Sequence, residues 1–138
     1  MMGKKDELIS PAKKNEKVKT EQDNSATVLN VIVEAMLEKK ASKILDLNLS
    51  NLDNSICDHF IITNANSTTQ VAAIADNVED KMIERLGIKL MRRGGDENAL
   101  WIILDYGNIM VHVFQTEYRS FYKLEELWAD ALITSYDE

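Results

Sequence analysis

Two histidines and one cysteine are the residues whose types most readily support metal binding or nucleophilic catalysis. His59 and His112 lie in stretches of apolar character, and neither stands at a metal-ligand spacing from the other or from Cys57. Cys57 has no fixed basic neighbour in the sequence and no nucleophile motif around it. The pattern favours two structural histidines and a buried thiol, with no metal site.

Carboxylates are the second candidates for chemistry. Enzymes that transfer nucleotides hold magnesium with two or three acids at adjacent strand positions. Asp105 is isolated between Leu104 and Tyr106, and Asp46 and Asp58 are distant from it in the sequence. These three acids would meet only by an accident of folding, so metal-dependent catalysis is the disfavoured alternative.

Phosphate binding has one candidate, the pair Arg92-Arg93 before Gly94-Gly95. Two arginines at a strand end more often keep that end solvated, and the two glycines alone indicate a turn. The sequence has neither a phosphate-binding loop nor a dinucleotide fingerprint. We therefore expect no catalytic residue, no cofactor and no enzyme activity.

The elements that position these residues follow from hydrophobic periodicity and turn signals. A capping box, Ser67-Thr68-Thr69-Gln70, opens the clearest helix, and Gly87 closes it. The expected order is helix, two strands, helix, three strands and helix, over residues 25–40, 44–49, 57–63, 67–86, 88–91, 100–105, 109–115 and 121–133. The last helix is expected to turn four residues inward: Leu124, Leu127, Trp128 and Ala131.

This order predicts an α/β fold of α+β character. About five strands form a mixed sheet with helices packed on it. The strand–helix–strand unit through residues 67–86 predicts a right-handed parallel crossover, and the last two strands form an antiparallel hairpin. Residues 1–24 are expected to be a disordered lysine-rich tail, and residues 25–138 a single domain.

The charge of the chain bears on its partners. The net charge is −7; residues 1–25 hold six lysines and five acids, which leaves ten basic and eighteen acidic residues for the rest. An acidic body is repelled by phosphate, so independent nucleic-acid binding is not expected, whereas a basic protein is a suitable partner. One cysteine and no apolar run of membrane-spanning length predict a reducing cytoplasm and no membrane association.

The hairpin around Tyr106-Gly107-Asn108 gathers aromatic residues on one face. A Gly107-Asn108 loop pairs Trp101 with Phe114, and a Tyr106-Gly107 loop pairs Trp101 with His112. Either register places five residues together: Trp101, Ile103, Met110, His112 and Phe114.

Both faces of this hairpin are apolar, as in a sheet that is covered on both sides. From the pattern alone, the aromatic face is more simply explained as core. Three helices fall short of what two faces of five strands require, however, and a bare aromatic face would be a partner or dimer surface.

Four segments resemble the RsfS/Iojap family of ribosomal silencing factors. They are Cys57-Asp58-His59-Phe60-Ile61-Ile62, Gln70-Val71-Ala72-Ala73-Ile74-Ala75-Asp76, the stretch from Trp101 to Phe114, and the stretch from Tyr118 to Trp128. The resemblance as a whole extends over residues 26 to about 132. The resemblance implies a nucleotidyltransferase-like architecture without the catalytic carboxylates.

The resemblance also implies a partner and a site. Family members bind ribosomal protein fourteen of the large subunit and block joining of the small subunit, which represses translation. The positions of Trp101 and Tyr106 lie in the family's partner-binding patch, which favours the interface reading of Trp101. Strand parity adds four residues to the expected partner-binding set: Ile103, Asp105, Met110 and His112.

Two departures from the family's common pattern fall near this patch. Gly94 stands where an acid is common, and Asn108 replaces another acid. Each change removes a carboxylate close to the patch. If either acid pairs a basic residue of the partner in the family, we expect weaker affinity here or a compensating change in the partner. Three alternatives to silencing stay open: a large-subunit assembly factor, as organellar relatives suggest, a nucleotidyltransferase-like enzyme, and a homodimer through the same patch.

Overall fold

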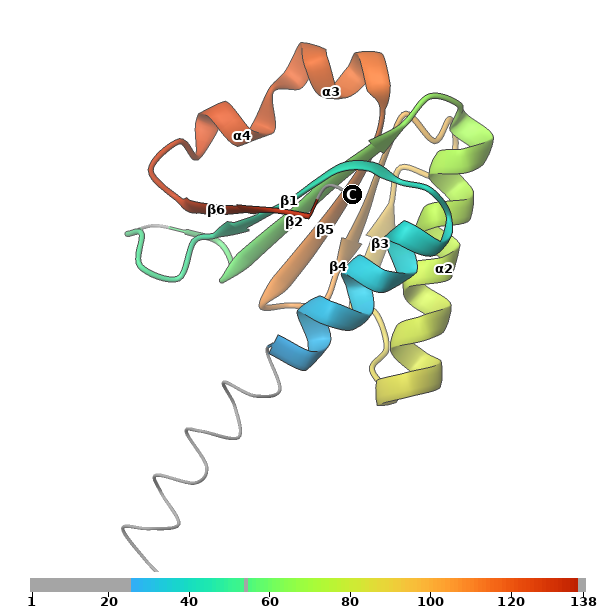
Figure 1. The fold of residues 1–138 in the computed structure, drawn as a ribbon, viewed down its shortest axis with the longest axis horizontal. Helices are drawn as coiled ribbons and strands as arrows, with labels where there is room; N and C mark the ends of the chain where they lie inside the picture. Colours follow the sequence, from blue (N-terminus) through green and yellow to red (C-terminus); the bar gives the residue numbers. More distant parts are fainter. Residues whose placement is uncertain (1–25, 54, 137–138) are drawn as a thin grey trace, which may run out of the picture. The chain divides into compact units, whose positions relative to one another are not determined.

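The structure, a computed structural model, describes residues 26–53 and 55–136. The expected tail over residues 1–24 lies outside them. A mixed sheet of six strands in the order β3-β4-β5-β2-β1-β6 forms the centre of the fold (Figure 1). The strands are β1 (Ser42–Asn48), β2 (His59–Ala65), β3 (Arg92–Gly94), β4 (Trp101–Asp105), β5 (Ile109–Gln115) and β6 (Leu132–Ser135). This confirms the predicted α+β class with a mixed sheet.

The central strands β2 and β5 are the parallel pair, and every other neighbouring pair is antiparallel. Apolar residues fill both faces of these two strands, so that Ile61, Ile62, Val111 and Val113 are all buried. Two antiparallel steps separate β5 from β3, so β3 runs parallel to β2. The strands before and after α2 therefore run in the same direction, as the predicted parallel crossover requires.

Helix α2 (Thr68–Leu86) begins and ends as its sequence predicts. The Ser67 side chain accepts a hydrogen bond from the Gln70 backbone N–H at 3.1 Å, and Gly87 closes the helix with φ of 66°. The Gln70 side chain does not complete the capping box. It donates instead to the carbonyls of Lys39 and Lys40, which follow the helix over residues 26–38.

Helices cover the two faces of the sheet unequally. Helix α2 contacts β2, β4 and β5, and Asn77 on α2 donates to the carbonyl of Ala35 at 2.8 Å. On the opposite face lie the short helices α3 (Thr116–Tyr122) and α4 (Leu124–Leu127), above the sheet in Figure 1. They cover a core cluster that includes Phe60 and Phe114. None of the helices that the structure describes is long and apolar enough to span a membrane.

Two predicted elements were wrong. Residues 88–91 are not a strand; the edge strand β3 begins at Arg92 and pairs with β4. The predicted helix over 121–133 is instead two short helices followed by β6. Lys123 takes a left-handed conformation (φ 49°) that ends α3, and β6 then pairs with β1 as a sixth strand. Leu127, expected to point inward, is 73% exposed.

The hairpin register is the one in which Gly107-Asn108 forms the loop. Trp101 lies opposite Phe114, and Ile103 lies opposite His112. At the other end of β4 the chain passes very close to Gly95. A Cβ at Gly95 would lie 1.9 Å from the Trp101 carbonyl oxygen. Gly95 also has a positive φ of 91°.

Gly95→Ala should therefore destabilise the domain by about 2 kcal/mol or more, because the backbone must shift and a strained φ must be kept. Urea unfolding measures this loss. Gly94→Ala is the matched control, since a Cβ there meets nothing within 4 Å. Equal losses for the two alanine variants would contradict the close approach at Gly95.

Candidate functional site

Five of the six predicted site residues share one face of the β4–β5 hairpin. Trp101, Ile103, Asp105 and Met110 are partly exposed there, and we call these four residues the Trp101 face. His112 lies beneath them and is only 3% exposed. His112 is therefore placed to support the Trp101 face from below, while the four others are open to a partner.

Trp101 is held on three sides. Its indole stacks on Phe114 at a centroid distance of 4.8 Å and is tilted against Tyr122 of α3 at 5.1 Å. Its Nε1–H donates to Nδ1 of His112 at 3.1 Å. Trp101 thus packs against the core cluster and is also partly exposed, so it combines the packing of a core residue with the accessibility that an interface residue needs. A fixed indole loses little conformational entropy when a partner covers it.

The hydrogen bond to Trp101 fixes the tautomer of His112. Nδ1 accepts, so the ring proton is on Nε2, which has no hydrogen-bond partner among the described residues. Phe60 lies at 4.6 Å from the imidazole, edge to face. Burial in these surroundings lowers the pKa of His112 to about 4, so the ring is neutral at pH 7.

This burial predicts that acid weakens the fold through His112. The folded-state pKa is about 4 and the ordinary value is 6.5, so the unfolded chain binds the proton more readily. Stability is complete above pH 6.5 and falls as the pH drops toward 4, by about 2 kcal/mol between pH 7 and pH 5. Urea unfolding of the wild type and of His112→Phe at both pH values checks this. Between pH 7 and pH 5 the variant should lose about 2 kcal/mol less stability than the wild type. Identical pH profiles would exclude the buried neutral histidine.

Tyr106, the sixth predicted residue, does not join the Trp101 face. Its hydroxyl is buried without a hydrogen-bond partner among the described residues. Burial and the Glu79 carboxylate of α2 raise the pKa of this phenol, and Arg93 lowers it. The Tyr106 hydroxyl therefore lies toward the α2 side, and any contact that Tyr106 makes with a partner would come from its ring edge or backbone.

The two adjacent arginines of β3 have different roles. Arg93 binds three carboxylates, Asp76 and Glu79 of α2 at 2.8 Å and Asp96 at 2.7 Å, and this raises its pKa. Arg92 is exposed and pairs with Asp105 at 3.3 Å. The phosphate-binding interpretation of this pair is weakened, because Arg93 is already surrounded by acids.

Exposed aromatic residues on α3 lie beside the hairpin and continue its apolar surface. Phe121 is 77% exposed, and Tyr122 beside Trp101 is 44% exposed. Sequence reasoning missed them because it placed residues 121–133 in one helix with an inward apolar stripe. The run Tyr118-Arg119-Ser120-Phe121-Tyr122 was the available signal, since five residues with three aromatic rings cannot all face one core.

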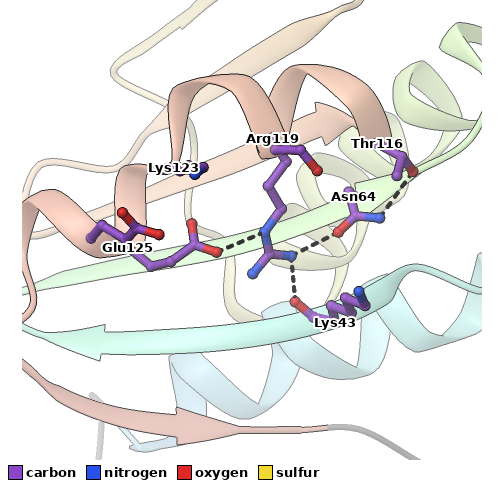
Figure 2. A pocket seen from close by; sticks show the side chains of 8 residues that line it. Lys43, Asn64, Thr116, Arg119, Lys123 and Glu125 are labelled. Carbon is purple, nitrogen blue, oxygen red and sulfur yellow. Dashed lines mark hydrogen bonds and ion pairs between the residues drawn. The ribbon is translucent and has the colours of Figure 1, made fainter.

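A buried arginine fixes α3 above the sheet (Figure 2). Arg119 is 7% exposed, and its Nη1 donates to the carbonyl of Lys43 on β1 at 2.6 Å and to Oδ1 of Asn64 on β2 at 2.8 Å. Its Nε donates to Glu125 at 3.4 Å, and Asn64 in turn donates to Thr116 at 3.1 Å. This network determines where Tyr122 sits relative to Trp101.

The other two candidates for chemistry, His59 and Cys57, have surroundings typical of structural residues. His59 Nδ1 lies 2.8 Å from Asp46 on the neighbouring strand, which joins β1 and β2. Cys57 is buried, and burial raises the pKa of its thiol to about 11. Across the described residues, no three His, Cys, Asp or Glu side chains are grouped so that they could hold a metal ion.

The fold and the Trp101 face together define a small α+β domain with a preformed surface around one fixed tryptophan, a residue type that is common in protein interfaces. Comparisons with known proteins give the family. Residues 22–138 match the family described as RsfS, ribosomal silencing factor during starvation. The chain belongs to this family of ribosomal silencing factors.

Individual relatives agree with this assignment. The ribosomal silencing factor RsfS of Bacillus subtilis is 36% identical over 114 residues, covering 83% of this chain and 95% of the relative. The chloroplastic protein Iojap of Zea mays is 35% identical over 72 residues, which is 52% of this chain and 31% of the relative. A crystal structure from Chromobacterium violaceum matches with a TM-score of 0.71 at 30% identity, covering 75% of this chain and 85% of that one.

Proposed function

We propose that this protein silences translation by docking its Trp101 face on ribosomal protein fourteen of the large subunit, so that the rest of the domain blocks joining of the small subunit. The observation that carries the proposal is Trp101 itself. In a family of ribosomal silencing factors, a partly exposed indole held by His112, Phe114 and Tyr122 has the features of an interface anchor.

Charge supports a protein partner over ribosomal RNA. The whole chain carries a net charge of −7, and Arg93 is shared among three acids. A basic ribosomal protein complements such a surface, whereas RNA phosphates are repelled by it. The mechanism is steric and needs no catalytic group, and a reducing cytoplasm suits the single buried Cys57 thiol.

Co-sedimentation with isolated ribosomal subunits tests the proposal. The purified protein should sediment with large subunits alone, and its addition should reduce the joining of large and small subunits. Binding to both subunits, or to neither, would overturn it. Binding without any effect on joining would instead favour the assembly-factor alternative, which a search for immature large subunits after depletion addresses.

A homodimer formed through the Trp101 face is the second possibility to test. A homodimer that covered Trp101 would compete with the ribosome. Analytical ultracentrifugation over a range of concentrations measures it, and Trp101→Ala should then abolish both the dimer and ribosome binding.

A further inference from the structure

An apolar hollow of about 260 Å³ opens at Ile103 and Met110, on the same sheet face as Trp101, where β3, β4 and β5 lie side by side. Ile103 and Met110 line it. Gly94 on the edge strand leaves it open, since a Cβ built on Gly94 would meet no atom within 4 Å. The hollow is several times larger than the roughly 30 Å³ that one water occupies in the liquid, so it has room for a side chain.

Charges at this edge of the sheet are fixed by the fold. Arg92 and Asp105, which also line the hollow, neutralise each other as an ion pair. Behind them Arg93 binds Asp76, Glu79 and Asp96, which leaves two carboxylate charges in excess. These acids lie on the α2 side of the sheet, so the hollow itself has an apolar lining with a neutral ion pair at its rim. Such a lining suits an apolar side chain, and the net charge of −7 on the chain suits a basic polypeptide as its carrier and repels phosphate.

We propose that the hollow formed by Gly94, Ile103 and Met110 receives a protruding apolar side chain, of the size of leucine or methionine, from a basic protein of the large subunit. This inference rests on the proposed docking of the Trp101 face. It adds a second anchor point next to Trp101 and makes Gly94 a determinant of partner choice. Any residue larger than glycine or alanine at position 94 would project into the space that the partner needs.

Filling the hollow tests the inference. Gly94→Leu should fold normally, because Gly94 is not among the residues with positive φ and its Cβ position is open. It should weaken binding to isolated large subunits by about tenfold or more, as loss of an anchor pocket does. Thr69→Leu is the matched control, since it adds an exposed uncharged leucine on α2, which covers the opposite face. Thr69→Leu should bind like the wild type.

A chemical footprint identifies what enters the hollow. Cys57 is the only cysteine of the chain, and burial raises the pKa of its thiol to about 11, so it reacts slowly with iodoacetamide. Gly94→Cys therefore adds one reactive thiol in the hollow, and Thr69→Cys adds one on α2. Large subunits, or the RNA-free protein fraction extracted from them, should slow alkylation at position 94 and leave position 69 unchanged.

The outcomes separate this inference from the proposed function. If the wild type sediments with large subunits but Gly94→Leu binds equally well and position 94 stays reactive, the hollow is not a contact and the inference fails alone. If the wild type does not bind large subunits, both fail. Protection by ribosomal RNA alone, or by raised concentration of the protein without subunits, would also overturn the inference, in favour of RNA or a second copy.

Discussion

Trp101→Ala should weaken binding to the large subunit at least about 30-fold, which corresponds to about 2 kcal/mol, while the domain still folds. The indole is partly exposed and fixed by the His112 hydrogen bond and by Phe114, so its truncation removes a preorganised contact. Because Trp101 also packs on the core cluster, we expect a stability loss of about 1–3 kcal/mol in addition.

Binding and stability must be measured on the same samples. Co-sedimentation at several protein concentrations gives the affinity, and urea unfolding gives the stability. Ile83→Ala is the control, since Ile83 is an exposed apolar residue on α2, on the opposite face. It should leave the affinity unchanged. A Trp101→Ala variant that folds and binds like the wild type would remove Trp101 from the interface, and one that fails to fold would place it wholly in the core.

Arg119→Met should lower the free energy of unfolding by about 3 kcal/mol, the largest loss that we expect from substituting one charged residue of this chain. The methionine fills a similar volume but leaves the Lys43 carbonyl, the Asn64 side chain and the Glu125 carboxylate without their donor. Part of the Glu125 charge reaches solvent, which limits the cost. Arg119→Lys should lose between about half and all of the stability that Arg119→Met loses, because an ammonium group cannot reach three acceptors in different directions.

The neighbouring element offers a control of the same residue type. Arg92 is 84% exposed at its side chain and makes a single pair with Asp105, so Arg92→Met should change stability by no more than about 0.5 kcal/mol. Both variants are compared by urea unfolding at pH 7. A loss below about 1 kcal/mol for Arg119→Met would show that α3 is held mainly by its apolar contacts and not by the polar network.

Local signals were sufficient for most of the fold. Ser67 and Gly87 mark the ends of α2 because cap chemistry is written in neighbouring residues. Strand alternation placed Trp101, Ile103 and Met110 on one face, and both loop registers that the sequence left open give this same grouping.

The errors arose where a local pattern was ambiguous. Leu124, Leu127, Trp128 and Ala131 fit a helical spacing, and nothing about a lysine announces that Lys123 will adopt φ of 49° and end the helix. Whether residues 132–135 form a strand depends on the free edge of β1, which is more than 80 positions earlier in the chain. Burial of His112 and of the Tyr106 hydroxyl likewise depends on helices that pack from elsewhere.

The lengths of the strands have a further consequence for how the protein meets others. Its two edge strands, β3 with three residues and β6 with four, are the shortest in the sheet. A short edge offers few free backbone groups to the strand of another chain, so sheet extension, domain swapping and fibrous aggregation are all discouraged. Recognition is thereby directed away from backbone pairing at the edges and toward side chains on the sheet's open face, where sequence can discriminate between partners.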